Sequence, residues 1–270
     1  GGSLLLATAR ATGLDRALSA ALVPWRAPRA VHDPGKVVLD LAVAVALGGD
    51  CLADVAVVRA QPGLFGAVAS DPTVSRLVAA LAADPAAALG AIRSARATAR
   101  AAAWVAQRPI TGGQVVVDLD ATLVSAHSEK ELAAPTFKRG FGFHPLLAFA
   151  DHGPGGTGEP LAGVLRGGKA TANDAKDHIA VLDAALAQLP EADRGDVLVR
   201  ADSGGGTKAF LGHITGLGLQ YSVGFYASTF VIDALASLPR QAWRHATEPD
   251  GSRRDGAQVA ELTRWLPDMT

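Results

Sequence analysis

The sequence predicts an α/β protein in which a helical N-terminal region precedes a mixed β-sheet. The first observation is a helical period in the alanine-rich front half, where Asp-Pro pairs open helices. The second is a change of period at residue 114, after which short β-branched runs are typical of buried strands. The third is the order of these elements, β-β-β-α-β-α-β-α-β-β. We therefore expect two regions, residues 1–110 and residues 111–270.

The front region is predicted to be helical throughout. Lys36–Leu47 is a compact apolar run, and Asp71 begins a second helix with a proline at its first position. Asp84 opens a long alanine-rich helix in the same way, and this helix runs to about Gln107 before Pro109 ends it.

The back region is predicted to alternate strands and helices. The expected strands are Gln114–Leu119, Phe143–Ala150, Leu161–Arg166, Asp196–Ala201 and Leu219–Phe225. The turn at residues 151–158 predicts a hairpin between the second and third strands. The expected helices begin at Asn173 as an N-cap, surround Phe210 and Ile214, and span Ser228–Leu238. A second hairpin is expected from Trp243–Ala246 and Gln258–Leu262.

Composition excludes several classes of protein. The chain has 270 residues, enough for one large or two modest domains, and no apolar run reaches the roughly 18 residues that a membrane span needs. A single cysteine, Cys51, excludes a disulfide framework and a zinc finger. No signal peptide is recognisable, so we expect a soluble, cytoplasmic protein. Because residue 1 is glycine and the only methionine is Met269, we also expect the central part of a longer protein.

Charge is divided unevenly along the chain. The formal net charge is −1, which by itself argues against a general nucleic-acid binder. Residues 1–110 carry 11 Lys/Arg and 7 Asp/Glu, whereas residues 111–270 carry 14 and 19. A mildly basic front and an acidic back suit a DNA-contacting region joined to a metal-binding core. Within the front region, Ser70–Leu77 resembles the start of a recognition helix, which makes Arg76 a candidate for DNA contact. An ordinary capped helix is the alternative.

Two aspartates at strand ends are the candidate catalytic residues. Asp120 follows the apolar run that begins at Val115, and Asp202 follows the run that begins at Val197. Carboxylates in these positions lie at the C-terminal edge of a sheet, where α/β proteins place their chemistry. If the two strands are neighbours, Asp120 and Asp202 meet and can hold a divalent metal.

Four motifs in order carry a family resemblance. They are Asp120-x-Thr122, Gly142–Leu147, Leu165–Ala170 and Arg200–Gly204. Together they resemble the catalytic domain of bacterial insertion-sequence DDE transposases of the cut-and-paste type, over most of residues 30–270. The resemblance implies a ribonuclease H-like mixed sheet with a β-β-β-α-β-α core, in which the first and fourth strands are adjacent and parallel.

The same resemblance implies the chemistry and the partners. Asp120 and Asp202 would be both catalytic and metal-binding, with Mg²⁺ (or Mn²⁺) as the cofactor. The reaction would be strand cleavage and strand transfer on double-stranded DNA, at transposon ends and at a target, by a homodimer. The third acid of the family is a glutamate on a later helix. Only Glu248 and Glu261 follow Asp202, and neither has that context, so we expect this acid beyond Thr270. With two of the three ligands, this chain alone is expected to have poor metal affinity and poor activity.

Two basic residues after the third strand are candidates for phosphate contact. Arg166 and Lys169 lie in a glycine-rich segment before a helix, and a solvated strand end is the alternative.

Two other functions remain open. Asp118 and Asp120 also resemble the first motif of haloacid-dehalogenase-like phosphohydrolases, in which Asp118 would be the nucleophile. Asp202 lacks the acidic neighbour which that family needs. A catalytically incomplete DNA-binding remnant is the other alternative.

Overall fold

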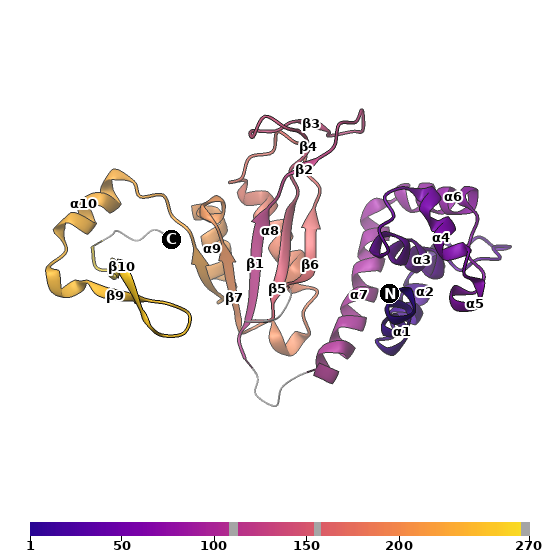
Figure 1. Ribbon diagram of the computed structural model, residues 1–270, viewed down its shortest axis with the longest axis horizontal. Helices are drawn as coiled ribbons and strands as arrows, with labels where there is room; N and C mark the ends of the chain where they lie inside the picture. The colour runs from indigo at the N-terminus through magenta and orange to yellow at the C-terminus, as the bar shows by residue number, and fades with distance from the viewer. Residues whose placement is uncertain (108–112, 154–157, 266–270) are drawn as a thin grey trace. The chain divides into compact units, whose positions relative to one another are not determined.

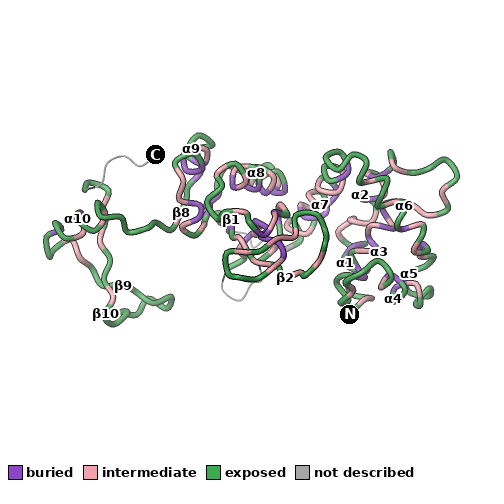
Figure 2. The backbone as a smooth tube through the Cα atoms, turned by 90° about the horizontal axis from the view of Figure 1, so that it is seen from above, coloured by how far each residue is buried: buried purple, intermediate pink, exposed green. Residues whose placement is uncertain are grey.

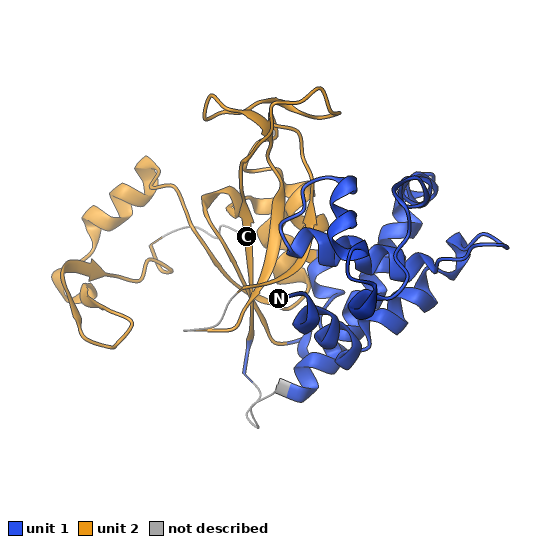
Figure 3. Cartoon of the chain, turned by 45° about the vertical axis from the view of Figure 1, so that its right-hand side comes forward, with its two compact units in different colours: residues 1–114, 183–195 blue, residues 115–182, 196–270 orange. Residues whose placement is uncertain are grey.

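The computed structural model describes residues 1–107, 113–153 and 158–265. The chain forms two compact units (Figure 3). The first consists of residues 1–114 and 183–195, and the second of residues 115–182 and 196–270.

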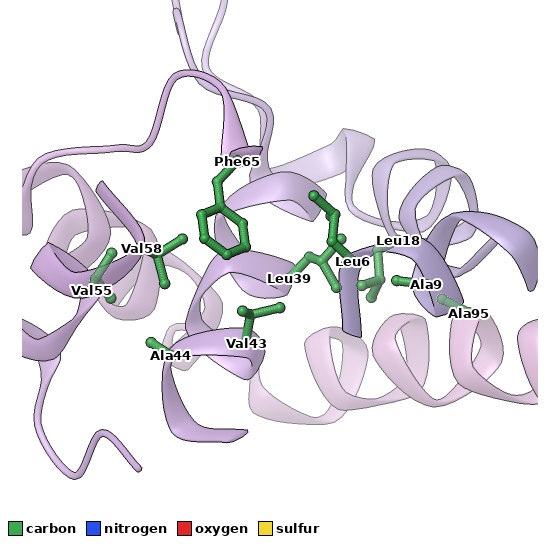
Figure 4. Packing of buried hydrophobic residues seen from close by; sticks show 10 residues of the cluster. All are labelled: Leu6, Ala9, Leu18, Leu39, Val43, Ala44, Val55, Val58, Phe65 and Ala95. Carbon is green, nitrogen blue, oxygen red and sulfur yellow. The ribbon is translucent and has the colours of Figure 1, made fainter. Parts of the chain in front are cut away.

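The first unit is helical, as the sequence predicts. Its α-helices are α1 (Gly2–Ala11), α2 (Leu14–Ala21), α3 (Pro34–Ala46), α4 (Val55–Arg59), α5 (Pro62–Phe65), α6 (Asp71–Ala82) and α7 (Pro85–Gln107). The unit also contains three short 3-10 helices, Val23–Trp25, Leu52–Asp54 and Glu191–Asp193, and the end of α8 (Ala175–Leu186). The core is formed by apolar side chains from α1 to α5 and from α7, among them Leu6, Leu18, Leu39 and Phe65 (Figure 4).

The predicted helix starts are largely confirmed. The Asp84 carboxylate accepts a hydrogen bond from the backbone N–H of Ala87, at 3.1 Å, at the start of α7. For α6 the N-cap is Ser70, and Asp71 is the first helical residue. Asp71 instead pairs with Arg59. The predicted end of α7 at Pro109 lies outside the described residues.

The second unit is built on a five-stranded mixed sheet in the order β6-β5-β1-β7-β8 (Figure 1). Its strands are β1 (Val115–Ala121), β5 (Leu146–Asp151), β6 (Glu159–Val164), β7 (Val197–Ala201) and β8 (Gln220–Val223). Neighbouring pairs β1–β5 and β5–β6 are antiparallel, whereas β1–β7 and β7–β8 are parallel. Counted along the chain within this sheet, the spatial order is 3-2-1-4-5. The first and fourth strands are therefore adjacent and parallel, as expected.

One face of the large sheet is covered by helices. The N-terminal part of α8 (Ala175–Leu186) and α9 (Lys208–Gly216) lie on the same side of the strands (Figures 1 and 2). Along β1 the burial alternates, because successive side chains point to opposite faces of a strand. Val117 and Leu119 are buried, whereas Val116 and Asp118 are half-buried and Asp120 is exposed. Asp118 and Asp120 thus belong to the more open face of the sheet.

A small second sheet was not predicted. The strands β2 (Val124–Ser125), β4 (Phe141–Phe143) and β3 (Ala134–Pro135) pair in the order β2-β4-β3. They stand at the end of the large sheet where β1 finishes (Figure 1). The expected strand Phe143–Ala150 is accordingly two strands, β4 and β5, interrupted at residues 144 and 145 because Pro145 has no N–H for a ladder.

The remaining predictions shift by a few residues. The cap of α8 is Asp174, not Asn173, since its carboxylate accepts from the backbone N–H groups of Lys176 and Asp177. The third strand ends at Val164, so that Arg166 follows it. Residues 154–157 of the expected turn lie outside the described residues. The last elements are α10 (Thr229–Ser237), the 3-10 helices Ser203–Gly205 and Arg240–Ala242, and the antiparallel pair β9 (Arg244–Thr247) and β10 (Arg253–Val259).

Among the described helices, none is by itself long and apolar enough to cross a membrane. One pair bent by 106°, Asp71–Ala82 with Pro85–Ala106, meets the criteria of length and composition only.

Candidate active site

Asp120 lies near the C-terminal end of β1, the central strand of the large sheet. Its backbone pairs with Leu147 of β5, and its side chain is exposed. Within the described part of the chain, its carboxylate has no hydrogen bond or ion pair. Two residues later, the Thr122 N–H donates to the carbonyl of Pro145 at 3.1 Å and anchors the chain as it leaves the strand. Both oxygens of Asp120 are therefore available to a ligand.

Asp202 follows the last residue of β7, the parallel neighbour of β1. It is the N-cap of a 3-10 turn, and its Oδ1 accepts the Gly204 N–H at 2.8 Å. The residue is exposed, and Oδ2 has no hydrogen bond within the described residues. The turn needs glycine at position 204, since a Cβ there would lie 2.8 Å from the carbonyl oxygen of Ala172. Close packing thus fixes the backbone beneath Asp202.

The parallel ladder brings the two aspartates to the same edge. The register pairs Asp118 with Arg200 and Leu119 with Ala201, so Asp120 and Asp202 are the next positions on the two strands. Carboxylate oxygens are hard ligands that Mg²⁺ and Mn²⁺ bind well. These two carboxylates, at neighbouring strand ends and open to solvent, have the donor chemistry to hold such an ion, which would take water and phosphate oxygens as further ligands.

Asp118 is engaged in a different arrangement. Arg200 binds both of its oxygens, Nε to Oδ1 at 2.5 Å and Nη2 to Oδ2 at 2.6 Å. The same Nη2 reaches Oδ2 of Asp151 on β5, at 2.7 Å. Sequence reasoning missed this contact between three strands. The available signal was a spacing of two residues, which puts side chains of one strand on the same face. Asp118 and Asp120 have this spacing, and so do Arg200 and Asp202.

Arg166 is not a surface residue. It is 5% exposed, and its guanidinium donates to the carbonyls of His144 and Thr171 and lies 3.4 Å from Asp177. This burial does not fit direct contact with a DNA phosphate, because the donors face the protein interior. Lys169, three residues later, is exposed and has no hydrogen bond or ion pair within the described residues. Of the two predicted cations of this segment, Lys169 is the one that solvent reaches.

Arg76 lies on α6 in the helical unit, exposed, with Nη2 bonded to the Thr73 hydroxyl at 3.0 Å. It lines an open cavity of about 880 Å³ together with Trp25, Arg29 and His32. The residues lining this cavity include no acid. Its charge is therefore positive and suits an anionic ligand.

The two later glutamates have other partners. Glu248 follows β9 in the turn that the sequence predicts, 3.7 Å from Arg254, and Glu261 accepts from the hydroxyl of Thr263. A separate acidic group, Asp50, Cys51 and Asp54, has ligand atoms within 4.8 Å of one another. There the Asp54 carboxylate accepts from the N–H groups of Asp50 and Cys51, a helix-start cap whose bonds hold the pKa of Asp54 below its usual value.

Comparison with known protein families gives a match over nearly the whole chain. Residues 1–266 match the family described as transposase DDE domain group 1. No curated protein matches the chain.

Proposed function

The chain belongs to the transposase DDE domain family of insertion-sequence type, and we propose that it cleaves and joins DNA strands with a metal held by Asp120 and Asp202. The observation that carries this assignment of residues is the parallel pairing of β1 and β7. It supports a common site because each strand delivers one exposed carboxylate to the same edge. The strand order 3-2-1-4-5 with helices on one face also supports a ribonuclease H-like fold.

The roles of the two acids follow from their surroundings. Asp120 offers two unengaged oxygens, whereas Asp202 offers Oδ2 while the Gly204 N–H fixes Oδ1. Asp202 is thus the more rigid ligand and Asp120 the more adaptable one. When bound here, Mg²⁺ would supply activation of a water or 3′-hydroxyl and stabilisation of the leaving oxygen. A glutamate contributed by the family's later helix would complete the ligand set.

Double-stranded DNA is the proposed partner, both as transposon ends and as target. The exposed Lys169 lies in the segment after β6, and the acid-free cavity beside Arg76 supplies a positive surface on the helical unit. A homodimer on paired ends and a cytoplasmic location are the corresponding proposals for assembly and place. They rest on the family alone.

The phosphohydrolase alternative has no structural observation in its favour. A nucleophilic aspartate must approach phosphorus with a free oxygen, and both oxygens of Asp118 bind Arg200. The remnant alternative differs from a transposase only in lacking metal-dependent cleavage. One experiment therefore tests all three functions.

The test compares two variants, Asp120→Asn and Asp202→Asn, with a matched control. The control is Asp118→Asn, which lies on the same strand as Asp120. We would measure nicking of supercoiled plasmid DNA with Mg²⁺ or Mn²⁺, and Mn²⁺ binding by electron paramagnetic resonance. Loss of a ligand should reduce cleavage by about 100-fold or more and weaken Mn²⁺ binding, while the control stays within about threefold. Hydrolysis of a phosphomonoester by the wild type, abolished in Asp118→Asn, would favour the phosphohydrolase. A folded protein that binds DNA but never nicks it, even when the family's later helix with its glutamate is supplied, would favour the remnant.

A further inference from the structure

We propose that Arg166 is a positioning residue that holds the backbone segments bearing Asp120 and Asp202 in a fixed relation. The inference rests on the proposed function, since it assigns to these aspartates a shared task. Arg166 follows β6, and its side chain is 4% exposed. Among the described residues, it makes no hydrogen bond or ion pair with either aspartate. Its effect would pass through two short series of contacts, one leading to each aspartate.

The first series of contacts leads to Asp120. The Arg166 Nε donates to the carbonyl of His144 at 2.9 Å, and the His144 N–H donates back to the carbonyl of Arg166 at 3.0 Å. The next carbonyl, that of Pro145, accepts the Thr122 N–H at 3.1 Å. Residues 144 and 145 thus join Arg166 to Thr122, which directly follows β1 and lies two residues after Asp120. The His144 ring is buried, and its Nδ1 lies 2.8 Å from the carbonyl oxygen of Ala170, so this connection is rigid.

The second series of contacts leads to Asp202. The Arg166 Nη1 donates to the carbonyl of Thr171 at 3.0 Å. The following carbonyl, that of Ala172, lies against Gly204, where an added Cβ would approach it to 2.8 Å. Gly204 in turn donates its N–H to Asp202 Oδ1. A shift of residues 171–172 would therefore move the turn that orients this carboxylate.

The chemistry of Arg166 argues for a task beyond stability. Its nearest carboxylate oxygen, on Asp177, is 3.4 Å from Nη1, and its Nη2 is buried without a hydrogen-bond partner among the described residues. A buried charge with incomplete hydrogen bonding contributes little net stability, and an apolar side chain often serves the fold as well. Only a planar guanidinium presents several donors in a fixed fork to two carbonyls at once. The need to hold two carbonyl groups in a fixed arrangement, more than a gain in folding free energy, explains why this buried position is an arginine.

The experiment uses Arg166→Lys and Arg166→Met on the full chain. The matched control is Arg194→Lys, because Arg194 also donates to two backbone carbonyls, those of Leu189 and Ala187, beyond the opposite end of α8. Three quantities are measured: the Mn²⁺ dissociation constant, the amide exchange rates of Thr122 and Gly204, and the plasmid-nicking kcat and KM. Thermal melting reports whether each variant is folded.

In the folded Arg166 variants we expect the Mn²⁺ dissociation constant to rise by about tenfold or more, as for residues that orient metal ligands. Exchange at Thr122 and Gly204 should be faster, and kcat should fall with little change in KM for DNA. The control should leave all three unchanged. Unchanged Mn²⁺ binding in a folded variant overturns the proposal, and so does equal loss in the control. If neither Arg166 variant folds, Arg166 is a structural residue and the proposal is also overturned.

Failure of the proposed function would look different. In that case Asp120→Asn and Asp202→Asn would bind Mn²⁺ as tightly as the wild type. The exchange rates of Thr122 and Gly204 in the Arg166 variants are therefore measured without metal or DNA. They report the mechanical connection by itself.

Discussion

Arg200 and Asp118 face each other across the parallel ladder of β1 and β7, two residues before Asp202 and Asp120. The two-point contact between guanidinium and carboxylate lies on the more open face of the sheet, and Asp151 of β5 joins it. Bonding to Asp118 is the main cause that raises the pKa of Arg200 above its usual value, so the arginine stays charged. One side chain thus links three adjacent strands next to the edge that carries Asp120 and Asp202.

This contact predicts a measurable but small coupling energy. A double-mutant cycle of Asp118→Asn and Arg200→Met should give about 0.5–1 kcal/mol in urea unfolding, because both side chains are more than a third exposed and solvent screens them. The coupling should decrease in about 1 M NaCl, where the Debye length is only about 3 Å. A coupling energy near zero at low salt would mean that the contact between Arg200 and Asp118 does not stabilise the pairing of β1 and β7.

Asp151 makes a pH-dependent prediction. Its pKa is held below 3.8, first by the N–H of Gly153, which donates to Oδ1 at 2.8 Å, and then by Arg200. Because the folded pKa is lowered, Asp151 contributes stability above the unfolded value, and this contribution is lost as pH falls through the folded pKa. In Arg200→Met, carboxyl NMR titration should show the pKa of Asp151 raised but still below 3.8, because the bond from Gly153 remains. A pKa that does not move would exclude Arg200 as a contributor.

The sequence was sufficient to predict the large sheet. Apolar β-branched runs ending in Asp120 and Asp202 mark strand ends that are buried on one face, and the parallel adjacency of their strands in the structure agrees with the family resemblance. The family assignment is confirmed by the match over residues 1–266. The roles of the two aspartates stay predictions, because no contact of the structure tests them.

Other parts of the site depend on tertiary packing that leaves little local signal. The strands β2 and β3 are two residues long, too short for a period to be read. Arg166 looks like a solvated strand-end cation in sequence, and only the folding of residues 167–177 around it makes it buried. The N-cap of α8 is Asp174, one residue after the predicted Asn173, because both residue types are good N-caps.

Two glycine substitutions should have opposite effects on stability. Gly168→Ala would place a Cβ 2.2 Å from the carbonyl oxygen of Ala134 and 2.6 Å from that of Gly142, so the small sheet or the segment after β6 must shift. We expect a loss of roughly 1–3 kcal/mol, as for overpacking. In α9, Gly212→Ala meets no atom within 4 Å and should stabilise by up to about 1 kcal/mol. Thermal melting measures both, and a neutral Gly168→Ala would contradict the close packing described.

DNA binding by the helical unit gives the last prediction. Arg76→Ala removes one cation from the acid-free cavity, so affinity for a DNA duplex should fall and the slope of log K against log salt should decrease by about 1. Arg10→Ala on α1 removes an exposed charge that does not line this cavity, and serves as the control. Fluorescence anisotropy from roughly 50 to 200 mM NaCl gives both slopes. Equal slopes for the two variants would show that charge number, and not the position of Arg76, governs binding. An Arg76→Ala slope identical to wild type would remove Arg76 from the DNA interface altogether.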